Sequence, residues 1–80
     1  MKVAIYSIEK TLFEGEAEKL IVETDGGQMT VLDHHIPIVT RIYGPTVYLI
    51  RREAERVTIP LEKGILEVRP ESEVVVLASI

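Results

Sequence analysis

Two adjacent histidines beside an acid come nearest to a catalytic or metal-binding set in this chain. Asp33, His34 and His35 supply carboxylate and imidazole groups of the kind that bind zinc. Adjacent residues of an extended chain point to opposite sides, however, so the two imidazoles cannot easily share one ion. A metal-dependent hydrolase on these residues is therefore the least favoured of three hypotheses. In the alternative interpretation, one histidine is solvated and the other hydrogen-bonds the backbone in a corner beside Pro37.

Other residue combinations that could do chemistry lack the context that they need. The serines stand outside any Gly-x-Ser-x-Gly sequence, which argues against a hydrolytic triad. Gly26-Gly27 leads into no helix that could hold a phosphate at its N-terminus, so a hairpin turn explains it better. The absence of cysteine excludes disulfides, zinc thiolates and thiol nucleophiles. We therefore expect no catalytic residue, no metal and no cofactor.

Length and composition indicate one small domain, residues 1–80, held together by packing alone. Hydrophobic residues make up 46% of the chain, and the net charge of −4 argues against binding to nucleic acid. Arginines 51, 52 and 56 alternate with Glu53 and Glu55, so no basic patch forms there. The longest apolar run, residues 74–78, is far too short to insert in a membrane. The first residues run directly into strand-like sequence, which predicts a cytoplasmic location.

Short bursts of β-branched residues and tyrosines, each closed by Gly, Pro, Asp or charged residues, are typical of an all-β domain. The predicted strands are residues 2–8, 17–23, 28–32, 38–42, 46–52, 57–61, 65–69 and 73–78. A break is expected at residues 13–15, a turn at Tyr43-Gly44-Pro45 and a charged hairpin tip at residues 51–56. No segment has the length of a crossover helix. The pattern predicts a flattened β-sandwich or barrel of two antiparallel sheets, with about eight to ten short strands.

Several segments, in order, resemble the epsilon subunit family of the F-type ATP synthases. They are Leu12-Phe13-Glu14-Gly15, Ala17-Glu18-Lys19-Leu20-Ile21-Val22, Gly27-Gln28-Met29-Thr30-Val31-Leu32, His35-Ile36-Pro37-Ile38-Val39-Thr40, Gly64-Ile65-Leu66-Glu67-Val68 and Val74-Val75-Val76-Leu77-Ala78. The resemblance covers essentially the whole chain. It implies a β-sandwich of two antiparallel sheets, as the strand pattern also does.

What the resemblance implies about function is a noncatalytic rotor subunit in the central stalk of a proton- or sodium-translocating ATP synthase. Such a subunit links the gamma subunit to the c ring and helps to transmit torque between ion flow and ATP synthesis. It lies at the cytoplasmic face of the energy-coupling membrane as a peripheral protein, without direct membrane insertion. The different-class alternative is a stand-alone β-sandwich module that binds some other protein.

The resemblance also implies two sets of contact residues. The set expected to face the c ring is Gly27, Gln28, Met29, Thr30 and His35. The set expected to face gamma is Ser7, Pro37, Ile38 and Thr40. Met29 is a flexible apolar side chain suited to a contact surface, although ordinary sheet packing is the alternative for Met29, Ile38 and Ser7.

The sequence departs from the family pattern in a few places. Thr30 and His34 stand where the family commonly has glycine, Tyr43-Gly44-Pro45 replaces a Pro-Gly order, and Lys63 replaces a second glycine before Gly64. Many family members also continue into a helical hairpin that inhibits ATP hydrolysis. This sequence stops at Ile80, so it is either a short form or cut at the domain boundary, and the starting methionine favours the short form.

Overall fold

The computed structural model describes the whole chain, residues 1–80, and contains eight β-strands, a single 3-10 turn and no α-helix. The strands are β1 (Lys2–Tyr6), β2 (Thr11–Glu16), β3 (Lys19–Thr24), β4 (Gly27–Leu32), β5 (Ile38–Ile50), β6 (Arg56–Pro60), β7 (Lys63–Arg69) and β8 (Glu73–Ser79). The 3-10 turn, η1, spans Arg52–Ala54. The prediction of an all-β sandwich is confirmed, and the sheet does not close into a barrel.

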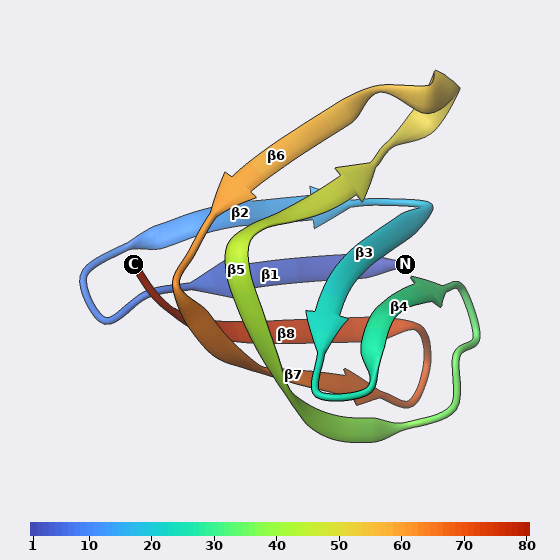
Figure 1. The fold of residues 1–80 in the computed structure, drawn as a ribbon. Helices are drawn as coiled ribbons and strands as arrows, with labels where there is room; N and C mark the ends of the chain where they lie inside the picture. The colour runs from blue at the N-terminus through green and yellow to red at the C-terminus, as the bar shows by residue number, and fades with distance from the viewer.

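One hydrogen-bonded sheet folds over on itself into two layers, and β5 joins them (Figure 1). Residues 38–43 of β5 pair with β7, and the layer continues through β8 and β1 to β2. We call this layer sheet I. Residues 46–50 of β5 pair with β6 on one side and β3 on the other, and β3 pairs with β4. We call this second layer sheet II.

The core lies between the two layers and is entirely apolar. Its sixteen buried residues come from both sheets and from the linking segments, and no polar side chain is buried with them. Along β1, β7 and β8, buried positions alternate with more exposed ones, as a pleated strand with one face on the core requires. With no disulfide, this packing is what holds the domain together.

The prediction of a turn at Tyr43-Gly44-Pro45 was wrong, because these residues lie inside β5 where the strand passes from sheet I to sheet II. Tyr43 pairs with Lys63 of β7 and with Glu23 of β3, so it belongs to both layers. Two predicted strands, 38–42 and 46–52, are therefore one. Glycine and proline occur here because the strand bends, while its pairing continues before and after the bend.

The expected break at residues 13–15 was also wrong, since these residues belong to β2. This strand lies at the edge of sheet I, and its pairing with β1 shifts register beside Tyr6. Gly15 and two neighbouring apolar residues, Leu12 and Phe13, obscure the alternation that would have revealed the strand. The eight observed strands thus equal the predicted count only because one strand was missed and another was divided.

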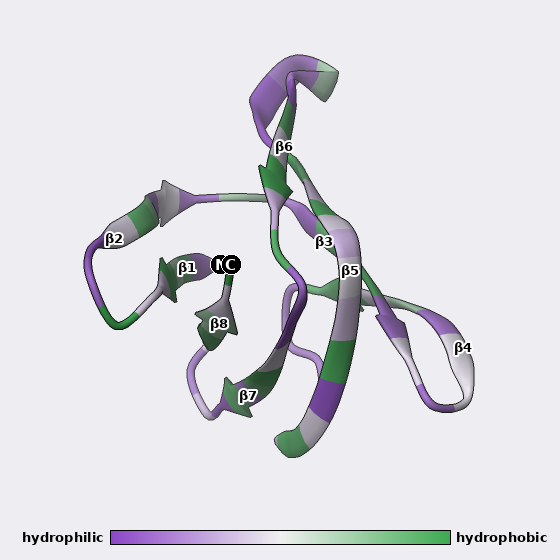
Figure 2. Cartoon of the chain, turned by 60° about the vertical axis from the view of Figure 1, so that its left-hand side comes forward, coloured by the Kyte–Doolittle hydropathy of each residue, from purple (hydrophilic) through white to green (hydrophobic).

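One pair of strands departs from the antiparallel arrangement expected throughout. β1 and β8, which carry the two ends of the chain, run parallel, with Val3 beside Val74 and Ile5 beside Val76. A parallel pair needs a long connection, and here the whole intervening chain provides it. The charged tip predicted at residues 51–56 is confirmed as the link between β5 and β6, and Figure 2 shows it as a hydrophilic projection from the body.

Candidate partner-binding surface

Four of the five residues expected to face the c ring, residues 27–30, lie on the β3–β4 hairpin at one edge of sheet II, and His35 lies in the loop after it. The hairpin turn is closed by Thr24, whose hydroxyl accepts from the Gly26 amide at 3.2 Å and donates to the Gly27 carbonyl at 2.8 Å. Gly27 has φ +110°, a conformation that glycine adopts without strain. Gln28 is exposed beyond this turn. The hairpin tip therefore presents mostly backbone and small polar groups to a partner.

Within the same hairpin, Met29 and Thr30 point to opposite sides of the sheet. Thr30 is exposed, whereas Met29 is half-buried opposite Val22 and packs against the core. The sulfur-containing side chain thus has a packing role in the free domain. Among the hairpin residues, the outward positions available to a partner are the turn itself, Gln28 and Thr30.

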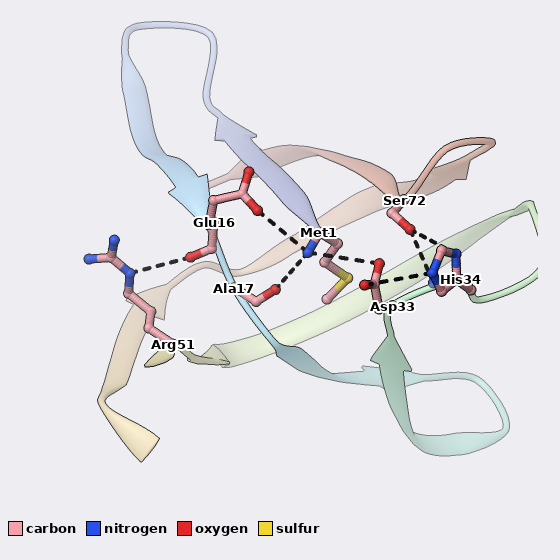
Figure 3. Close-up of polar contacts among 7 residues, drawn as sticks. All are labelled: Met1, Glu16, Ala17, Asp33, His34, Arg51 and Ser72. Atoms are coloured by element: carbon pink, nitrogen blue, oxygen red, sulfur yellow. Dashed lines mark hydrogen bonds and ion pairs between the residues drawn. The ribbon is translucent and has the colours of Figure 1, made fainter. Parts of the chain in front are cut away.

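A half-buried ammonium group, that of Met1, ties together the loops beside this hairpin (Figure 3). The Met1 amine donates to the Ala17 carbonyl at 3.0 Å and lies 3.7 Å from Glu16 and 3.9 Å from Asp33. The Ser72 hydroxyl, which accepts from the His34 amide at 3.2 Å, lies beside the Asp33 carboxylate; hydrogen bonding from Ser72, helped by the nearby ammonium charge, holds the pKa of Asp33 below its ordinary value. The start of β1, the end of β2 and the loop after β4 therefore meet at one point.

The two histidines follow Asp33 in the loop between β4 and β5 and differ in environment. The His34 side chain is 86% exposed and lies 3.9 Å from the Asp33 carboxylate, and its backbone has φ +65°. The His35 ring donates from Nδ1 to the Ile36 carbonyl at 2.8 Å. The interpretation of one solvated histidine and one backbone-bonded histidine is confirmed. No group of three His, Asp or Glu residues in the chain is arranged to hold a metal ion.

The residues expected to face gamma fall at two separate places. Pro37, Ile38 and Thr40 lie at the start of β5, directly after His35, so the two expected contact sets adjoin there. Ser7 lies in the β1–β2 turn, where its hydroxyl accepts from the Lys10 amide at 3.1 Å. Three strand spacings, about 14 Å, separate the β1 and β5 positions across sheet I. Ile38 and Thr40 lie on the same side of β5 as buried Ile42, and Ile38 packs against the core, so the outward residue of this segment is Val39.

The face of sheet I between these two places carries several exposed apolar side chains, and the sequence analysis did not identify it. We call it the outer face of sheet I; its apolar side chains are those of Ala4, Tyr6, Val39, Ile65, Val75 and Leu77. Val39 is 68% exposed, Leu77 58% and Ile65 43%. Tyr6, Leu77 and Ile65 stand side by side on neighbouring strands. Contiguous apolar surface of this kind marks an interaction site.

A sequence signal for this face existed in the closing strand. A strand with one solvated face alternates apolar and polar residues, but residues 74–78 are all apolar. In the structure Val74, Val76 and Ala78 are buried, while Val75 and Leu77 point outward. An uninterrupted apolar run in an otherwise half-solvated sheet is therefore the pattern that indicates a covered outer face.

The chain contains no helix with the length and hydropathy needed to cross a bilayer.

Curated relatives were found along the full chain. The chain is 35% identical over 81 residues to the ATP synthase epsilon chain of Laribacter hongkongensis, covering 100% of this chain and 57% of the relative. It is 38% identical over 71 residues to the ATP synthase epsilon chain of Herminiimonas arsenicoxydans, covering 88% of this chain and 51% of the relative. The chain thus spans about half the length of these relatives.

Solved structures share the fold at lower identity. The mitochondrial ATP synthase of Euglena gracilis, solved as OSCP/F1/c-ring, contains a chain that matches with a TM-score of 0.87 at 15% identity, covering 98% of this chain and 49% of that chain. The central stalk and c-ring structure of the Tetrahymena thermophila mitochondrial ATP synthase gives 0.83 at 8% identity, covering 100% and 63%. The family model for the ATP synthase delta/epsilon chain, beta-sandwich domain, matches residues 1–80. Together with the two-layer fold, this match shows that the chain belongs to the delta/epsilon β-sandwich family of ATP synthase subunits.

Proposed function

We propose that this chain is a noncatalytic central-stalk subunit of an ion-translocating F-type ATP synthase, which links the gamma subunit to the c ring. The observation that carries the proposal is the outer face of sheet I. An acidic domain that presents exposed Ile65 and Leu77 beside half-buried Tyr6 needs a partner to cover them. Family membership and relatives named as epsilon chains support the stalk as the place of that partner.

In this proposal gamma covers the outer face of sheet I from the Ser7 turn to the beginning of β5, where Val39 points outward between Ile38 and Thr40. A lasting interface has an apolar centre and a polar rim. The apolar residues of the face form the centre, and charged residues of the same strands, such as Arg41 and Glu67, lie beside them. The interface therefore follows the strands that connect the two expected places.

The c ring, in turn, meets the β3–β4 hairpin and the loop after it. Gly27, Gln28, Thr30 and His35 offer exposed backbone and polar groups, which suit a contact with polar loops. Met29 supports this surface from the core side. The chain then lies at the cytoplasmic side of the membrane as a peripheral subunit, in contact with the ring and not with lipid.

A subunit that transmits torque must resist shear between its two contact surfaces. Here the hairpin and the outer face of sheet I belong to one continuous hydrogen-bonded sheet, which contains most of the 47 backbone hydrogen bonds. Force applied at the hairpin passes through β3 and β5 to β7 along backbone pairing. Continuous pairing of this kind gives the stiffness that a rotor part requires.

The test is association of the chain with its own gamma subunit, measured by pull-down and by the size of the complex. We expect a stable one-to-one complex. Leu77→Asp, on the outer face of sheet I, should abolish it, while Leu32→Asp, an exposed leucine of sheet II, should leave it intact. Circular dichroism must show both variants folded. If the folded wild-type domain does not bind gamma, the alternative of a stand-alone binding module replaces the proposal.

A further inference from the structure

A shallow groove crosses the outer face of sheet I where β5, β7 and β8 lie side by side. It is lined by Arg41, Tyr43, Lys63, Ile65, Leu77 and Ser79, with backbone of the same strands between them. Ile65 and Leu77 are paired across β7 and β8 and form an apolar floor. Arg41 is paired with Ile65, and Tyr43 with Lys63, so the two cations stand on neighbouring strands beside that floor.

The charge of the groove is opposite to that of the protein. The chain has a net charge of −4, yet the lining contains two cations and no carboxylate. Neither Arg41 nor Lys63 takes part in any ion pair of the structure. Asp25, which is not part of the lining, accepts a hydrogen bond from the Tyr43 hydroxyl at 2.7 Å. Two cations thus remain without an ion-pair partner beside exposed apolar side chains.

A second depression, at the opposite end of the same face, provides an internal comparison. Its lining includes two cations, Lys2 and Arg69, but also Glu14, Glu16 and Glu73. Arg69 is already paired with Glu67 at 3.1 Å. Carboxylates outnumber cations there, so the excess of cations in the first groove is not a general property of this face.

We propose that the groove of Arg41, Lys63, Ile65 and Leu77 seats a segment of the gamma subunit that carries carboxylates beside an apolar side chain. The inference rests on the proposed function and specifies the chemistry of the partner segment. The apolar side chain contacts Ile65 and Leu77, while the carboxylates accept hydrogen bonds from the Arg41 guanidinium and the Lys63 ammonium. Complementary charge also steers the two subunits into register as they meet.

The direct test is carbodiimide cross-linking of the chain bound to its own gamma subunit. This reagent joins a lysine amine to a carboxylate only where the two are in contact. We expect mass spectrometry to find Lys63 joined to an Asp or Glu of gamma. Lys63→Arg keeps the positive charge but has no amine that the reagent can join, so this variant should lose that cross-link. Cross-links to gamma only through Lys2, Lys10 or Lys19 would overturn the inference.

Charge reversal gives an independent measurement. Arg41→Glu with Lys63→Glu should weaken gamma binding about 100-fold, because like charges would then face each other. The control, Lys19→Glu with Arg52→Glu, makes the same change in net charge at exposed positions outside the groove and should alter binding by less than about threefold. The association rate of the wild type should fall with added salt more steeply than that of the groove variant.

These results separate the inference from the proposed function. If the wild type binds gamma and the groove variant binds as tightly, the inference fails while the stalk assignment stands. If the folded wild type does not bind gamma, the assignment fails and the inference falls with it.

Discussion

Replacing Gly44 by alanine should remove a large part of this domain's free energy of unfolding, although the change adds only one methyl group. A Cβ atom at residue 44 would lie 1.9 Å from the Leu61 carbonyl oxygen and 3.2 Å from that of Glu62. Both atoms are backbone, so no side-chain rotation can make room. The Gly44 amide donates to Glu62 at 2.8 Å, and the Leu61 amide donates to Pro45 at 3.0 Å. The methyl group must push these two backbones apart.

The magnitude follows from what is lost. Two backbone hydrogen bonds contribute about 1 kcal/mol each, and overpacking costs about 1–3 kcal/mol, so we expect a loss of about 3–5 kcal/mol. A chain of this length has a free energy of unfolding of about 4–12 kcal/mol. At about 4–8 °C per kcal/mol, the midpoint of thermal unfolding should fall by at least about 12 °C.

Urea and thermal unfolding followed by circular dichroism would measure the loss, since the chain has no tryptophan. Gly26→Ala is the matched control, because its nearest neighbour to a new Cβ would be the Thr24 hydroxyl at 3.8 Å, an ordinary contact. Its stability should stay within about 0.5 kcal/mol of the wild type. A Gly44→Ala domain less than about 1 kcal/mol weaker than the wild type would refute the reasoning from close approach.

Three further predictions concern single side chains. The Asp25 carboxylate accepts a hydrogen bond from the Tyr43 hydroxyl and thereby raises the pKa of Tyr43, so the bond stabilises the fold at neutral pH and is lost as alkali removes the phenol proton. Asp25→Ala should lower the pKa of Tyr43 in an ultraviolet titration, and an unchanged pKa would contradict the hydrogen bond. The pKa of Asp33 is lowered, so its contribution to the stability of the fold is present above the ordinary pKa range of a carboxyl group and is lost as acid protonates it. In an NMR titration Ser72→Ala should raise the pKa of Asp33, and an unchanged pKa would show that Ser72 does not cause the shift. Met29→Asp should destabilise the isolated domain by about 2 kcal/mol in urea, because it places a charge against the core; a stability equal to the wild type would make Met29 a surface residue.

The strands that alternate strictly could be predicted from the sequence, and those shaped by tertiary contacts could not. β1, with Val3 and Ile5 buried, follows the period of two and was predicted within two residues. Nothing in the sequence around Gly44 indicates that the backbone of Leu61, 17 residues further along the chain, packs against it. The bend in β5 was therefore predicted as a turn. Close approach between distant segments is a property of the folded chain, and a glycine alone does not tell it from a turn.

The candidate surface shows the same limit in another form. The family resemblance selected Gln28, His35 and Thr40 as expected contact residues, because they stand in segments whose spacing is recognisable. Leu77 and Ile65 were assigned to neither face, since apolar residues in strands are usually buried and the sequence does not say which face of a sheet is covered. Once the register places Leu77 beside Ile65 and opposite to buried Val76, the outward direction follows from the pleat alone. To locate an interface on a sheet, one must know which alternate residues of each strand point outward. This can be deduced only when at least one residue of each strand is known to be buried.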